Sequence, residues 1–245
     1  MSKRVIGSSV LGILVFLFFG LLAAQEPVGI ERISPGRELE LVDKVAAARR
    51  AYKESLENLK NYYIEVGDAY KEALVEQELQ GLRLVHKPEY ILLVDRLSLA
   101  TVPAEHIAAA DELYADAKNY KDYPDLFTKK NRLVIAIQKF KEIIEKYPTS
   151  DKVDDAAFRL GEIYDGFYFR DYHAAAKYYE ACFRWNPNTE YPARLRAAKS
   201  HYKHTKNFPK AAELYKEAME NSPISENQLK ARKKLEEMRE RSLIE

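Results

Sequence analysis

Apolar positions recur three times along this chain with one spacing. An alanine is followed by a large apolar or aromatic residue four positions on, a smaller or apolar one three further on, and a proline five beyond that. The copies are Ala136, Phe140, Ile143 and Pro148; Ala175, Tyr179, Cys182 and Pro187; and Ala211, Tyr215, Ala218 and Pro223. Steps of four and three follow one stripe of an α-helix, which a proline cannot continue. The copies start 39 and 36 residues apart (175 − 136 and 211 − 175), a period typical of stacked helical hairpins.

A second motif precedes the second and third copies. Its residues are Leu160, Gly161 and Tyr164, and then Ala198, Lys199 and Tyr202. Together the two motifs resemble the tetratricopeptide repeat, whose first helix carries W-x2-L-G-x2-Y and whose second carries A-x3-F and a closing proline. The resemblance covers residues 104–223 and implies a right-handed α-solenoid of three helical hairpins that binds other proteins.

The chain departs from this repeat pattern in three places. Ala157 and Leu195 stand where the repeat has tryptophan, and the second copy has two extra residues between its helices. In the first copy, residues 118–131 form a long insertion between the two expected helices. We therefore expect stacked hairpins with unusual loops.

The start of the chain predicts a targeting segment. Lys3 and Arg4 precede an apolar to weakly polar run, Val5–Ala24, so residues 1–24 fit a signal peptide cleaved before Gln25. The same length also fits an uncleaved signal anchor. Both alternatives place the rest outside the cytoplasm, with membrane contact only through an uncleaved segment.

The regions around the repeats divide by composition. Residues 25–37 form a Pro- and Gly-containing linker, and 38–85 have the composition of helix, with an apolar stripe from Val45 to Tyr63. Gly67 predicts a helical hairpin over 38–85, and a single coiled-coil helix is the alternative. Residues 86–103 are expected to be an extended connector, and 224–245 a capping helix on the last repeat.

Composition supports an all-α protein. Hydrophobic residues make up 47% and charged residues 31%, with only nine glycines, so we expect almost no strand. Without Lys3 and Arg4 the 39 basic residues become 37 against 38 acidic ones, a net charge of −1. This balance does not favour a nucleic-acid partner, which a basic excess would indicate.

Motifs of catalysis are absent from the sequence. We find no glycine-rich phosphate loop, Cys-x-x-Cys, His-Glu-x-x-His or Gly-x-Ser-x-Gly. Cys182 is the single cysteine and is expected to be buried. His201 and His204 alone share a helix face, and two ligands do not complete a zinc site. We therefore expect no enzyme, no cofactor and no metal.

The resemblance implies where a partner binds, because the first helices of tetratricopeptide hairpins line a concave groove. Carried over position by position, the groove residues are Asp155, Phe158, Arg159, Glu162 and Asp165, then Arg196, Ser200, Lys203 and His204. Phe158 and Glu162 replace residues that clamp a C-terminal carboxylate, so the resemblance disfavours that ligand. An ordinary solvated face is the alternative to a binding site.

The clearest repeat stretch, AIQKFKEIIEKYPTSDKVDDAAFRLGEIY, resembles periplasmic repeat proteins of Gram-negative envelopes. These include the outer-membrane assembly lipoprotein BamD and the Tol–Pal coordinator. The chain lacks the BamD lipid-anchor cysteine, and residues 86–131 have no counterpart in the Tol–Pal domain arrangement. The resemblance implies a non-catalytic periplasmic scaffold or adaptor for a protein or peptide partner, acting in cell-envelope or outer-membrane assembly. An accessory subunit that docks an exported or envelope enzyme is the alternative.

Overall fold

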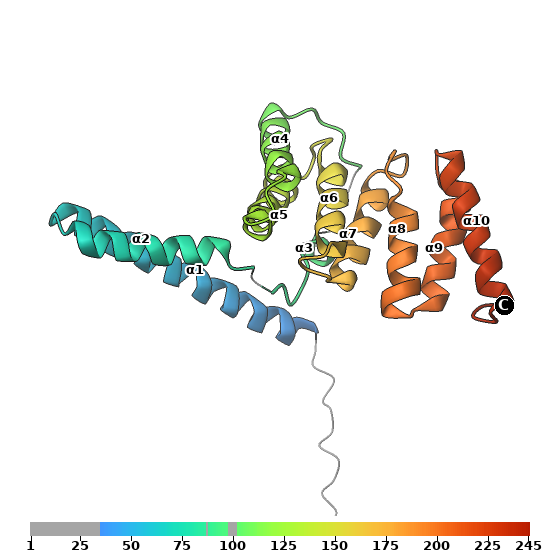
Figure 1. Ribbon diagram of the computed structural model, residues 1–245, viewed down its shortest axis with the longest axis horizontal. Helices are drawn as coiled ribbons and strands as arrows, with labels where there is room; N and C mark the ends of the chain where they lie inside the picture. The colour runs from blue at the N-terminus through green and yellow to red at the C-terminus, as the bar shows by residue number, and fades with distance from the viewer. Residues whose placement is uncertain (1–34, 87, 98–101) are drawn as a thin grey trace, which may run out of the picture.

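The computed structural model describes residues 35–86, 88–97 and 102–245, and all regular elements in these ranges are helices (Figure 1). The all-α prediction is thereby confirmed for the described residues, which contain one isolated β-bridge and no strand. The predicted targeting segment, 1–24, and most of the predicted linker lie outside them.

The chain begins with a helical hairpin that projects from the rest of the molecule (Figure 1). Helix α1 (Pro35–Glu65) and helix α2 (Ala69–Leu84) are joined by a turn in which Gly67 has a φ of +74°, a left-handed conformation that suits glycine. Asp68 caps α2 by accepting a hydrogen bond from the backbone N–H of Lys71. The residues between 35 and 84 therefore form two helices rather than one continuous helix.

The connector after this hairpin is fastened to the repeats at several points. The short helix α3 (Leu93–Arg96) buries Leu93 and Val94, and so part of the expected extended segment is helical. Further on, Glu105 pairs with Ser150 in the isolated β-bridge, and its N–H donates to the carbonyl of Thr149 at 2.9 Å.

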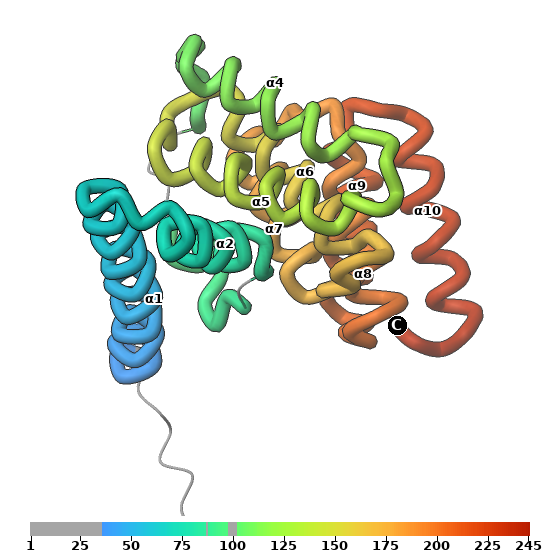
Figure 2. Tube along the Cα trace, turned by 60° about the vertical axis from the view of Figure 1, so that its left-hand side comes forward, coloured from blue at the N-terminus to red at the C-terminus, as the bar shows by residue number. Residues whose placement is uncertain are grey.

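Three helical hairpins and a final helix follow, each element packed against the next (Figures 1 and 2). They are α4 (Ala108–Asp122) with α5 (Lys129–Lys146), α6 (Val153–Asp165) with α7 (Tyr172–Trp185), α8 (Ala193–Ser200) with α9 (Phe208–Asn221), and α10 (Ser225–Glu240). One turn of π-helix, His201–Thr205, extends α8. The expected long insertion at 118–131 is wrong, because α4 runs on to Asp122 and only a short loop separates it from α5.

The repeated sequence pattern forms the core between these helices. Its alanines, Ala136, Ala175 and Ala211, are fully buried, and so are Phe140 and Tyr179. Each proline of the pattern lies two residues after the end of a second helix, at 146, 185 and 221. A small residue followed by an aromatic one thus lets neighbouring helices approach closely and fills the groove beside the contact.

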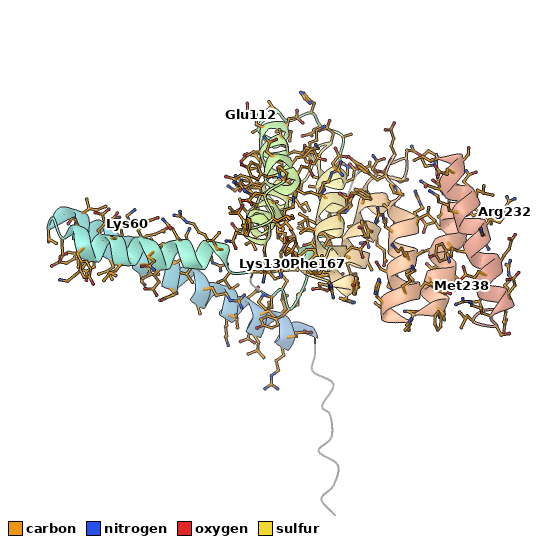
Figure 3. All side chains as sticks on the ribbon, in the orientation of Figure 1. Lys60, Glu112, Lys130, Phe167, Arg232 and Met238 are labelled. Carbon is orange, nitrogen blue, oxygen red and sulfur yellow. The ribbon has the colours of Figure 1, made fainter. Side chains whose placement is uncertain are left out.

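The final helix, α10, covers the last hairpin with a buried apolar side and has an exposed charged side. α10 buries Ala231, Leu235 and Met238, whereas Arg232 is exposed (Figure 3). An apolar stripe on the last hairpin is thereby covered, and charged side chains face water.

Candidate partner-binding face

Arg159, near the middle of α6, connects three successive hairpins. Its Nε donates to the Tyr114 hydroxyl on α4 at 3.2 Å, and its Nη2 donates to the Tyr191 hydroxyl, just before α8, at 3.4 Å. Its Nη1 donates to the Glu162 carboxylate at 2.9 Å. The side chain is only 19% exposed, so its position is determined by these partners.

Ion pairs continue this arrangement along the first helices. Lys121 of α4 lies 3.0 Å from the Glu162 carboxylate, and Arg196 of α8 lies 3.7 Å from that of Asp165. We call the surface formed by these side chains the Arg159 face. It consists of Tyr114, Lys121, Asp155, Arg159, Glu162, Asp165, Tyr191 and Arg196.

Asp155 belongs to this face and is partly buried. Burial raises the pKa of its carboxyl group, while the Tyr191 hydroxyl and the Lys152 ammonium oppose that shift. The Asp155 carboxylate is therefore an acceptor held beside Arg159.

Four of the nine residues predicted for the groove lie elsewhere or are covered. Phe158 is 3% exposed and stacks on the Tyr191 ring, with centroids 4.3 Å apart, and Ser200 is 2% exposed. Neither offers surface to a partner in this structure. Lys203 and His204 are exposed on the π-helical turn, where the His204 ring stacks on Tyr172 at 3.5 Å. The structure thus brings together Asp155, Arg159, Glu162, Asp165 and Arg196.

A second polar cluster, not expected from the sequence, joins the connector to the repeats. Lys141 of α5 contacts the Glu89 carboxylate and donates to the Tyr164 hydroxyl at 2.8 Å. Tyr164 in turn donates to Glu89 at 3.1 Å, and Tyr178 donates to it at 3.5 Å. Burial lowers the pKa of the Lys141 ammonium to about 7, while the charges of Glu145 and Asp171 oppose that shift. The contacts of Lys141, Tyr164 and Tyr178 with Glu89 hold the connector against the repeats.

A cavity of about 280 Å³ adjoins this cluster between α1, the connector and α5. Apolar side chains such as Val42 and Ile137 line it together with Arg49 and Lys141. Arg49 lies over the Tyr90 ring, 5.9 Å from its centroid, so the cavity wall is partly held by the hairpin itself.

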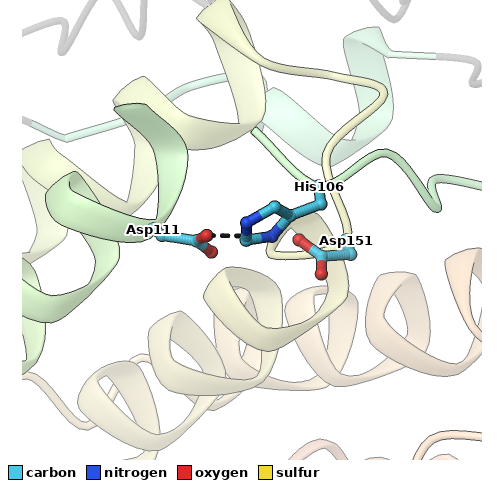
Figure 4. Close-up of side chains that lie close together, drawn as sticks. All are labelled: His106, Asp111 and Asp151. Atoms are coloured by element: carbon cyan, nitrogen blue, oxygen red, sulfur yellow. Dashed lines mark ion pairs between the residues drawn. The ribbon is translucent and has the colours of Figure 1, made fainter. Parts of the chain in front are cut away.

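Among the described residues, His106, Asp111 and Asp151 bring possible metal-ligand atoms within 4.8 Å of one another (Figure 4). His106 Nδ1 lies 3.0 Å from Asp111, and the Lys152 ammonium lies 3.5 Å from Asp111 and 3.3 Å from Asp151. The Lys152 ammonium lies near both carboxylates, and these contacts fasten the connector and α4 to the start of α6.

The two histidines that share a helix face in sequence have separate surroundings. His201 Nε2 lies 2.9 Å from the Glu180 carboxylate, whereas His204 stacks on Tyr172. Each imidazole is thus engaged by a different neighbour.

Within the described ranges, every helix is too short or too polar to cross a membrane. Comparisons with models of protein families, with curated proteins and with solved structures find no match.

Proposed function

We propose that this protein is an exported, non-catalytic adaptor of the tetratricopeptide type, a right-handed solenoid that holds a protein or peptide partner in cell-envelope or outer-membrane assembly. The observation that carries the proposal is the Arg159 face. Arg159 hydrogen-bonds to residues on either side of its own hairpin, so the charged surface runs across three hairpins without a break.

The chemistry of this face suits a polypeptide ligand. Charges of opposite sign alternate along it, from Lys121 through Glu162 and Arg159 to Asp165 and Arg196. Hydrogen-bonding groups held in place by their neighbours lose little side-chain entropy when a ligand binds. A surface that extends over several helices can contact the successive polar groups of a peptide in extended or helical form.

Export is proposed from the sequence of the first 24 residues. Lys3, Arg4 and the apolar run after them support a signal segment. The mass of the protein purified from its native cells tests this, because cleavage before Gln25 removes 24 residues. An intact chain in the cytoplasmic fraction contradicts export.

Site-specific photocrosslinking tests the binding face. A photoreactive amino acid replaces Lys121 or Arg196, which lie on the Arg159 face in different hairpins. Lys216 of α9 serves as the control because it is exposed on a second helix. We expect one and the same product from the first two positions and none from Lys216. Equal labelling at all three positions, or labelling at Lys216 alone, contradicts the proposal.

The identity of the crosslinked protein separates the two functional alternatives. A component of envelope-assembly machinery supports the adaptor. An enzyme recovered at a fixed ratio supports the role of accessory subunit.

A further inference from the structure

Helix α1 carries a regular, largely apolar stripe that is exposed among the described residues. Its positions follow steps of 4, 3, 4, 3, 4, 3 and 4 residues. They are Leu41, Val45, Ala48, Tyr52, Ser55, Leu59, Tyr62 and Val66, and all eight are exposed. We call them the α1 seam. Alternating steps of four and three are the heptad pattern of coiled coils. Val66 lies just past the helix end, yet its N–H still donates to the Tyr62 carbonyl at 3.0 Å.

Helix α2 packs beside this seam rather than on it. The core of the hairpin consists of Leu56, Val75 and Leu79, with Tyr63 and Leu82 packed at its edge. The connector contacts other positions of α1, through Arg96 to Asp43 and through Tyr90 to Arg49. Of the seam, Val45 also lines the cavity beside the connector. A helix of 31 residues with so small a core has most of its apolar surface exposed among the described residues.

We propose that a second copy of this chain covers the seam, with the two α1 helices antiparallel. Residues whose numbers add to 107 then face each other across the two-fold axis, beginning with Leu41 opposite Val66. The following layers are Val45 with Tyr62, Ala48 with Leu59, and Ser55 with Tyr52. In these three layers a smaller side chain meets a larger one, which is the packing that fills a core without voids.

A parallel pair does not have this complementarity. It places Tyr52 against Tyr52, Ala48 against Ala48 and Ser55 against Ser55, which gives one crowded layer and two poorly filled ones. Charge favours the same orientation. The antiparallel register brings Lys44 beside Glu65 of the second copy, whereas the parallel register brings it beside Arg49.

The polar atoms of the seam already have partners within their own chain. The Ser55 hydroxyl donates to the Ala51 carbonyl at 2.8 Å, and the Tyr52 hydroxyl contacts the Glu78 carboxylate of α2. Ser55 can therefore enter an interface without losing a hydrogen bond. The seam extends over 25 residue steps (66 − 41), which corresponds to about 38 Å of helix.

Cysteine crosslinking of the full chain tests both the partner and the register. Ala48→Cys and Leu59→Cys chains carrying different tags are co-expressed and oxidised, and Cys182 contributes no background because it is fully buried. We expect a disulfide between the two variants and none when either is expressed alone. Crosslinking of Ala48→Cys with itself indicates a parallel pair and overturns the proposal.

The mass in solution gives an independent result. Leu59→Glu places a charge in the seam, and Ile64→Glu places one at an equally apolar exposed position of α1 outside it. We expect the mass of the Leu59→Glu protein to fall to half, while the Ile64→Glu protein keeps the wild-type mass and both keep wild-type helix content. A monomeric wild-type protein, whether free or bound to a different protein through α1, overturns the proposal.

Discussion

Gly161, in the middle of α6, is a position where a single added methyl group has two opposing effects. Alanine favours a helix interior over glycine by about 1 kcal/mol. A Cβ at Gly161, however, would lie 2.6 Å from Cδ1 and Cε1 of Tyr179 on α7, about 1 Å inside ordinary contact. The Tyr179 ring is fully buried and has Phe158 beside it at 5.5 Å between centroids, so it has no free space to move into.

Overpacking of this kind lowers the free energy of unfolding by about 1–3 kcal/mol. Over most of that range the loss is larger than the gain of about 1 kcal/mol from the higher helix propensity of alanine. We therefore expect Gly161→Ala to lower the free energy of unfolding by up to about 2 kcal/mol and the melting temperature by up to about 8 °C. Urea unfolding followed by circular dichroism measures the change. Gly81→Ala in α2 is the matched control, because a Cβ there meets no atom within 4 Å, and it should cause no loss. A Gly161→Ala protein that gains as much stability as the Gly81→Ala protein would refute the close contact between α6 and α7.

Three further predictions concern buried ionisable groups. Lys141→Met leaves the Glu89 carboxylate without its cation and should lower the free energy of unfolding by roughly 3 kcal/mol. The Lys141→Met/Glu89→Leu double variant should recover most of this loss, as measured by urea unfolding. No difference between the single and double variants would contradict the pairing. Burial raises the pKa of Asp154 from 3.8 to about 6, so the folded state binds the extra proton and stability falls as the pH rises from about 4 to 6. Asp154→Asn should flatten the plot of unfolding free energy against pH in that window, and an unchanged slope would count against the raised pKa. Burial also raises the pKa of the Cys182 thiol, so a thiol reagent should label it at least roughly a hundredfold more slowly in the folded protein than in urea.

The core of the repeats could be predicted because it depends on local periodicity. Steps of four and three residues place Ala175, Tyr179 and Cys182 on one stripe, and all three are buried. The insertion expected at 118–131 was wrong because the repeat pattern says nothing about helix length. Residues 118–122 contain no helix breaker, and Lys118 and Asp122 form an ion pair one helical turn apart, so α4 continues to Asp122, two residues before Pro124.

The candidate site was predictable only in part, because its contacts join distant segments. Position within the repeat sufficed to place Arg159 and Glu162 on the same face. The partners that hold Arg159 lie 45 residues before it, at Tyr114, and 32 after it, at Tyr191. The pairing of Glu89 with Lys141 likewise depends on the path of the connector, which has no repeat pattern to indicate its course.

The charged groups of the Arg159 face are paired with one another, whereas the apolar side chains of the α1 seam are exposed among the described residues, and this difference makes the two proposals separable. If a partner with two equivalent sites is held by both copies of a dimer, linking the copies raises the effective concentration of the second site. Leu59→Glu should then weaken crosslinking at Arg196 although α1 lies outside the Arg159 face, and Ile64→Glu should leave it unchanged. If crosslinking at Arg196 is the same in both variants, each copy holds its partner alone, and the seam serves only to pair the chains.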